Sequence, residues 1–142
     1  MPRLSDEAVR AMHLLALDAT ALVRRIESRH EQMVAGFSRL RDRDALLGAL
    51  HAFGLTARFQ DFSALPIAVQ DAALRFYELA DDLRWYCKFT QDMPGALSLR
   101  LEAFRRELAQ AHAALARVLE ASTSRARRRR PAARPARAKA RG

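Results

Sequence analysis

Residues 69–118 read VQDAALRFYELADDLRWYCKFTQDMPGALSLRLEAFRRELAQAHAALARV, and this stretch decides the fold. On both sides of Met93-Pro94-Gly95, mostly apolar residues recur at alternating steps of four and three. These positions are Val69, Ala73, Phe76, Ala80, Leu83, Cys87 and Thr90 before the turn, and Leu97, Leu101, Phe104, Leu108, Ala111, Leu115 and Val118 after it. This spacing gives an α-helix one apolar side, and Pro-Gly breaks a helix. We therefore expect antiparallel helices at 66–91 and 96–121 joined by a tight turn.

The N-terminal residues have the same period. Its positions, again at steps of three and four, are Val9, Met12, Ala16, Ala19, Val23, Ile26, His30, Met33, Phe37 and Leu40. Before this seam, Ser5 is a favourable N-cap residue, and Asp6 and Glu7 suit the positive end of a helix dipole. The pattern predicts a long helix that begins at Ser5.

The end of this first helix is less clear from the pattern. The seam could continue past the polar residues 41–44, or the chain could break there and restart on an aspartate that caps a new helix. We favour the break, because an unbroken helix would be nearly twice as long as its partners. The sequence then predicts helices at 5–41 and 44–53, the second one stopped at Gly54.

Residues 55–65 form the one long connection of the bundle. Phe59, Phe62 and Leu65 make it too apolar for a free linker, and we expect these side chains to plug one end of the bundle. The whole pattern predicts an all-α fold over residues 1–124. The predicted fold is an antiparallel three- to four-helix bundle with heptad-like seams that pack as in a coiled coil.

Length and composition fit one small domain. The chain has 142 residues, of which 50% are hydrophobic and 29% charged, so most of it can bury a core. The net charge of +9 is uneven, because nine of the 25 basic residues lie in residues 125–142 without any acidic residue. The other 16 basic residues balance the 16 acidic residues of residues 1–124. We therefore predict a neutral body followed by a disordered polycationic tail at 125–142.

This basic tail is the strongest functional signal. Its cations are Arg125, Arg127, Arg128, Arg129, Arg130, Arg134, Arg137, Lys139 and Arg141. Nucleic acid is the commonest intracellular polyanion, and each phosphate that a cation neutralises releases counterions. In composition the tail resembles the Ala/Pro/Lys tails of bacterial histone-like and other nucleoid-associated proteins, with Arg in place of Lys. The resemblance implies binding to DNA or RNA through phosphate, without readout of base sequence.

A cluster of aromatic residues suggests a second surface. Trp85, Tyr86 and Phe89 cover more than one face of their helix, and aromatic residues are enriched in protein interfaces. We predict a protein interface there, either for a helical partner or for a second copy of the chain. The alternative is that these rings cap the bundle together with Phe59 and Phe62.

Motifs for metal and cofactor chemistry are incomplete. Glu27 and His30 have the Glu-x-x-His spacing of carboxylate-bridged di-iron bundles, but those bundles need a second such pair and two further glutamates. We therefore predict no metal site and no cofactor, and we expect His30 to be a packed or hydrogen-bonded seam residue. Cys87 is the single cysteine, and its seam position predicts a buried, inert thiol.

A ribonuclease is a further reading. Small all-helical ribonucleases of toxin–antitoxin systems, the HEPN class, place a histidine five to seven residues after an arginine on one helix. Arg106 and His112 have this spacing, as do Arg25 and His30. The resemblance implies a histidine that acts as acid or base and an arginine that stabilises the charge of the phosphorane.

Taken together, these features favour a non-enzymatic nucleic-acid-associated protein whose tail supplies sequence-independent affinity for phosphate. The alternative is a helical adaptor, chaperone or scaffold module with an accessory basic tail. The longest run without a formal charge, residues 45–57, has 13 residues, fewer than a membrane-spanning helix needs. We expect a cytoplasmic protein that associates with the nucleoid.

Overall fold

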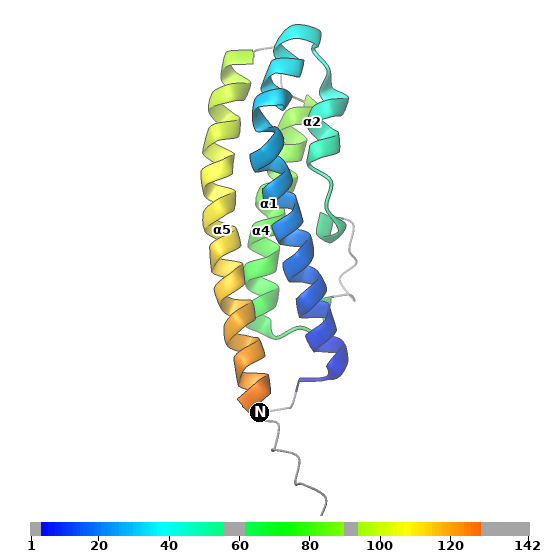
Figure 1. The fold of residues 1–142 in the computed structure, drawn as a ribbon, viewed down its shortest axis with the longest axis vertical. Coiled ribbons are helices and arrows are strands. Elements are labelled where there is room, and N and C mark those ends of the chain that lie inside the picture. Colours follow the sequence, from blue (N-terminus) through cyan, green and yellow to red (C-terminus); the bar gives the residue numbers. More distant parts are fainter. Residues whose placement is uncertain (1–3, 56–61, 90–93, 129–142) are drawn as a thin grey trace, which may run out of the picture.

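The computed structural model describes residues 4–55, 62–89 and 94–128 (Figure 1). Its elements in chain order are α1 (Asp6–Leu40), α2 (Arg43–Ala49), the short 3-10 helix η1 (Phe53–Leu55), α4 (Ile67–Phe89) and α5 (Pro94–Arg128). No strand occurs among these described residues. The prediction of an all-α helical bundle is confirmed.

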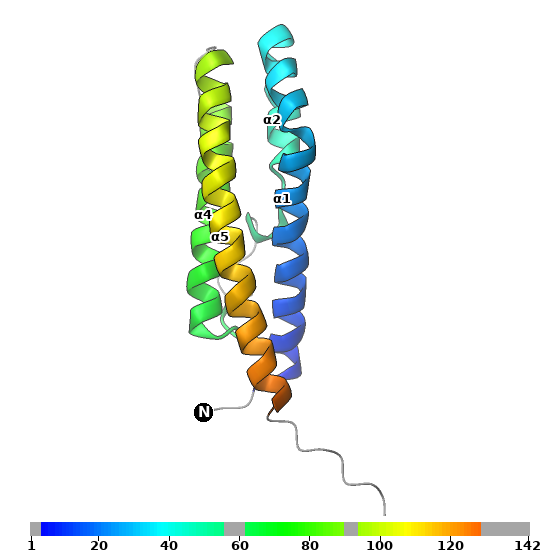
Figure 2. The same cartoon turned by 60° about the vertical axis from the view of Figure 1, so that its left-hand side comes forward.

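The helices are packed in a ring. Helix α5 packs against α4 and α1, and α2 packs against α1 and α4 from the other side. Figures 1 and 2 show that α1 and α4 run in one direction and α5 runs in the other. Because α2 has 7 residues, it covers only one part of the bundle, and η1 contacts α1 and α4 beyond it. The bundle therefore has a four-helix end, where α1 and α4 finish, and a three-helix end, where α5 finishes.

The break between α1 and α2 is built by two capping residues. Arg41 has a left-handed backbone, with φ 53°, and its N–H donates to the carbonyl of Phe37 at 3.0 Å. Asp42 then caps α2, since its side chain accepts the N–H groups of Asp44 and Ala45 at 2.9 and 3.5 Å. The predicted break is confirmed, and so is Ser5 as the N-cap of α1.

Helix α2 ends earlier than the predicted residue 53. The guanidinium of Arg25 on α1 donates to the carbonyls of Ala49 and His51, the first at 3.4 Å. These carbonyls are turned toward α1 instead of being bonded within a continuing helix. The chain then makes η1 as a separate element, with Gly54 at its centre.

The core confirms the seams of α4 and α5. Every seam position from Val69 to Cys87 and from Leu97 to Leu115 is buried, and Val118 is half-buried. On α1 the buried residues are Ala8, Met12, Leu15, Ala19, Leu22, Ile26, Met33 and Phe37. The predicted α1 seam is wrong at its two ends, because Val9 and Leu40 are exposed. Leu15 and Leu22, which lie beside the seam, are buried. A helix that packs against neighbours on two sides buries a wider stripe than a single heptad seam.

The connection before α4 contributes to the core as predicted, at least in its second half. Leu65 is buried, and Phe62 is half-buried against the core. Phe59 and Thr90 lie outside the described residues.

Helix α5 is longer than predicted at both ends. It begins at Pro94 and continues through Ser122–Ser124 to Arg128, so Arg125, Arg127 and Arg128 are helical instead of disordered. The hydroxyl of Thr123 donates to the carbonyl of Leu119 at 2.8 Å, which satisfies this polar side chain inside the helix. Cations are also favourable in the last turn of a helix, where the carbonyls point outward. The remaining tail cations, at positions 129–141, lie outside the described residues.

Candidate nucleic-acid interface

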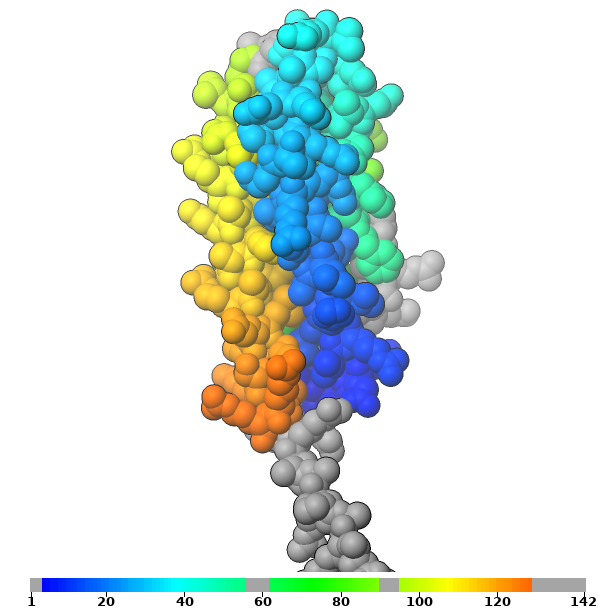
Figure 3. Space-filling model, viewed as in Figure 1, coloured from blue at the N-terminus to red at the C-terminus, as the bar shows by residue number. Residues whose placement is uncertain are grey.

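The described part of the basic tail is the last turn of α5. Arg125, Arg127 and Arg128 are all exposed, and Ala126 between them is half-buried. Among the described residues these three arginines take part in no ion pair. Figures 1 and 3 show that this turn lies at the three-helix end, beside the first turns of α1. The fold thus presents three cations on a helical support directly before the rest of the basic segment.

In contrast to these three residues, one arginine in the middle of the bundle forms ion pairs. Arg105 on α5 binds Glu27 of α1 at 2.6 Å and Glu102 of its own helix at 2.7 Å. The hydrogen bond from Arg105 is the main reason why the pKa of Glu27 is lowered. This guanidinium therefore connects two helices and is already engaged with two carboxylates.

The aromatic cluster is divided by the fold. Trp85 is 64% exposed and Phe89 is 57% exposed, whereas Tyr86 is half-buried with the guanidinium of Arg100 over its ring at 5.7 Å. Phe62 precedes α4 and so lies at the opposite end of that helix, about 35 Å from Phe89 for 23 residues. The alternative in which these rings cap the bundle with Phe62 is therefore wrong. A protein interface at Trp85, Tyr86 and Phe89 stays a prediction.

His112 occupies a position between three helices. Its Nε2 lies 3.2 Å from the hydroxyl of Thr20 on α1, and its ring is 5.9 Å from the ring of Phe76 on α4. Burial lowers its pKa, because the cationic form loses solvation there. The environment favours a neutral imidazole that packs and hydrogen-bonds across the bundle.

The residues of the two arginine–histidine pairs have different surroundings. Arg106 is exposed on α5, and His112 follows six residues later, about one and two-thirds turns, on another face of the helix. Arg25 donates to backbone carbonyls of residues 49 and 51, while Nδ1 of His30 lies 2.8 Å from the carbonyl of Glu27. The ribonuclease reading stays a prediction.

A polar cluster that the sequence did not indicate lies at η1. The carboxylate of Asp18 accepts the N–H groups of Phe53 and Gly54, each at 2.9 Å, and the O–H of Tyr77 at 2.5 Å. Burial and the neighbouring Asp18 carboxylate raise the pKa of Tyr77. A Cβ at Gly54 would lie 2.1 Å from the Tyr77 ring, so glycine is required there. The cluster fastens η1 to α1 and α4 and is structural.

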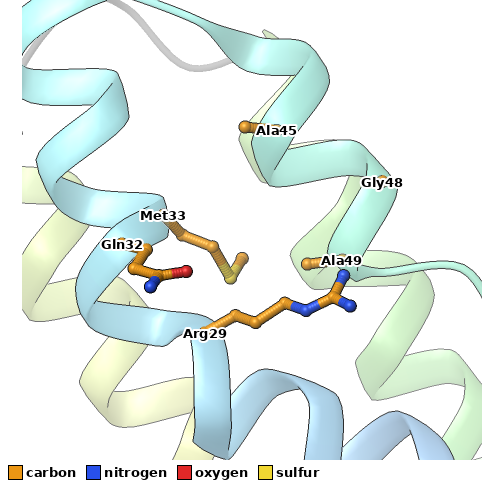
Figure 4. A pocket seen from close by; sticks show the side chains of 6 residues that line it. All are labelled: Arg29, Gln32, Met33, Ala45, Gly48 and Ala49. Atoms are coloured by element: carbon orange, nitrogen blue, oxygen red, sulfur yellow. The ribbon is translucent and has the colours of Figure 1, made fainter.

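Other polar features form no obvious site. Between α1 and α2 there is an open hollow of about 550 Å³, shown in Figure 4, with Arg29 and Gln32 on one side and Ala45, Gly48 and Ala49 on the other. Among the described residues that line it, Arg29 is the only charged one. Within the described ranges, no group of three His, Cys, Asp or Glu residues has the geometry to hold a metal ion.

The single thiol lies in the core, on the buried side of α4. Cys87 is buried as predicted, and this burial raises the pKa of its thiol to about 11. The thiolate, which is the reactive form, is therefore scarce near neutral pH. None of the described helices combines enough length with enough apolar character to cross a membrane.

Comparison with known proteins gives no assignment. No protein-family model matches the chain, and neither a curated protein nor a solved structure is significantly similar to it.

Proposed function

We propose that this protein binds nucleic acid without catalysis and without readout of base sequence, through the basic end of α5 and the segment that follows it. The observation that supports the proposal is the exposure of Arg125, Arg127 and Arg128 on the last helical turn. Six further cations follow within residues 129–142, and no acidic residue interrupts them. The rest of the chain has as many acidic as basic residues and therefore no net charge.

The proposed mechanism is electrostatic. Each arginine that contacts a phosphate displaces condensed counterions, and their release favours binding most at low salt. The helical turn fixes where the first phosphates lie relative to the bundle, whereas base readout would need side chains held in a groove. Such a protein binds DNA and RNA, and we expect it in the cytoplasm in association with the nucleoid.

The test compares two variants of equal charge change in the full chain. In the first, Arg125, Arg127 and Arg128 are replaced by glutamine. In the matched control, the exposed residues Arg24, Arg39 and Arg75 of the body are replaced in the same way. Affinity for a labelled random duplex and for RNA is measured by fluorescence anisotropy at several salt concentrations.

We expect the tail variant to reduce the slope of log affinity against log salt by about 3, roughly one unit per lost phosphate contact. The control variant should change this slope by clearly less. Equal effects of the two variants would show that any surface arginine serves, and the proposal would then be wrong. Absence of binding by the unmodified protein at low salt would also exclude it.

A further inference from the structure

The second half of α4 carries a surface that the proposed function does not use. Four exposed residues, Arg84, Trp85, Lys88 and Phe89, lie on its last two turns, and we call them the aromatic–basic patch. The rings of Trp85 and Phe89 are 4.9 Å apart between centroids, and Nζ of Lys88 lies 5.4 Å from the centre of the Phe89 ring. More than half of each aromatic side chain is nevertheless in contact with solvent. Two large rings are thus held together without being covered.

Two further arginines lie near the patch. Arg41 and Arg43, at the adjoining break between α1 and α2, hold their guanidinium groups 5.7 and 5.3 Å from the ring of Phe37. Arg43 also donates to the carbonyl of Cys87 at 2.9 Å, which places it next to the end of α4. The patch therefore lies at an end of the molecule where Arg41 and Arg43 alternate with the exposed residues Asp42 and Asp44. This is the four-helix end, and the 35 residues of α5 separate it from Arg128 by about 52 Å.

Exposed rings among cations match the chemistry of a single nucleic acid strand. Unpaired bases stack on aromatic side chains regardless of their identity, while lysine and arginine neutralise the phosphates between them. A duplex offers phosphates but keeps its base faces covered by neighbouring bases. The centre of a protein interface is instead depleted in lysine and other charged residues. The patch alternates charge and ring along the helix, with Arg84 and Lys88 beside the two aromatic residues.

We propose that the aromatic–basic patch binds single-stranded nucleic acid, with bases stacked on Trp85 and Phe89 and phosphates held by Arg84 and Lys88. This inference deepens the proposed function and rests on it, since it names the form of nucleic acid that the bundle itself recognises. The Arg-rich end then supplies affinity for any polyanion, and the patch supplies a preference for unpaired strands.

Trp85 is the only tryptophan of the chain, so its fluorescence reports on this patch alone. The full-length protein is titrated with an oligothymidylate and with a random duplex of the same length. The titrations are repeated with a full-length variant in which all nine basic residues of 125–142 are glutamine. We expect the single strand to quench the fluorescence saturably in both proteins, with weaker affinity in the variant. The duplex should leave the emission nearly unchanged.

A substitution supplies the second measurement. Trp85→Ala should weaken binding of the labelled oligothymidylate by about 5- to 100-fold, as expected for the loss of one stacked base, and should leave duplex binding nearly unchanged. The matched control is Leu74→Ala on the same helix, where the side chain is 60% exposed but aliphatic. This control should change neither affinity.

The outcomes separate the two proposals. If the oligonucleotides bind by anisotropy while Trp85 emission stays constant and Trp85→Ala binds normally, the patch proposal is wrong and the proposed function stands. Quenching by the single strand that is equally strong in the nine-glutamine variant would support the patch and contradict the proposed function. Equal quenching by the duplex would overturn the patch proposal. So would a concentration-dependent shift of the emission without nucleic acid, combined with no effect of the single strand, since it would indicate a protein interface.

Discussion

Both ends of the bundle present exposed cations, but different residues surround these cations at each end. At the three-helix end, α5 finishes with Arg125, Arg127 and Arg128 and no aromatic residue. At the four-helix end, Arg84 and Lys88 each precede an exposed aromatic residue, Trp85 and Phe89. A helix C-terminus favours cations in any protein, so basic ends alone say little about function. What distinguishes these ends is the long continuation of charge at one and the uncovered aromatic pair at the other.

The ends also differ in how they are built. Helix α2 is the fourth helix of the core at one end only. The short helix η1 lies where the four-helix part changes into the three-helix part. A core residue surrounded by four helices loses more van der Waals contacts on truncation than one surrounded by three. Three changes in stability test this difference, in decreasing order of expected effect.

The largest effect is expected from Phe37→Ala. Phe37 is fully buried at the four-helix end, beneath the guanidinium groups of Arg41 and Arg43. Its loss should lower the free energy of unfolding by about 3–5 kcal/mol. Leu119→Ala, at the three-helix end, should lower it by about 2 kcal/mol, since Leu119 is smaller and retains 7% exposure. Urea unfolding followed by circular dichroism measures both values, and a larger loss for Leu119→Ala would refute the difference between the ends.

An intermediate effect on stability is expected at η1, between the four-helix and three-helix parts. Asp18→Ala leaves two backbone N–H groups and the Tyr77 hydroxyl without their acceptor, which should lower the free energy of unfolding by about 1–3 kcal/mol. Tyr77→Phe removes only one of the three donors and should cost about 1 kcal/mol. The exposed Asp81→Ala is the control for loss of a carboxylate on the surface. An Asp18→Ala variant as stable as this control would show that η1 is not fastened by the cluster.

A smaller and pH-dependent effect is expected from His112. Its pKa is lowered in the folded protein, so the unfolded chain binds a proton more readily. Stability should therefore fall as the pH drops below about 6.5, the ordinary histidine value, and continue to fall until the folded pKa is reached. His112→Gln should flatten this part of the stability profile, whereas His13→Gln, at an exposed position, should not. The same pH profile in both variants would contradict the assignment.

The sequence predicts the features that neighbouring residues determine better than the contacts between residues far apart in the chain. The seams of α4 and α5 were predictable at almost every position, because helical period is a local property of the chain. The break after Leu40 was predictable for the same reason, since Asp42 is a capping residue beside it. The end of α5 was not, because Ser122–Ser124 favour helix ends in general, and here the Thr123 hydroxyl finds a carbonyl within the helix.

Long-range pairing explains what the sequence did not reveal. Asp18 and Tyr77 are separated by 59 residues, and nothing in the local pattern of either indicates the other. The same holds for the division of the aromatic cluster, in which Tyr86 is half-buried under Arg100 while Trp85 and Phe89 are exposed. The nucleic-acid interface follows from the run of basic residues after position 124, which is visible in the sequence. Cations at a helix end are common in proteins, so the fold adds only the position of the first three arginines.

The salt dependence of binding tests the central proposal most directly. Affinity of the full-length protein for a random duplex is measured over a series of salt concentrations, beside the variant in which the nine basic residues of 125–142 are glutamine. If all nine cations contact phosphate, the slope of log affinity against log salt should be about −8, and it should approach zero in the variant. A slope near zero for the unmodified protein, or the same steep slope for the variant, would contradict the account.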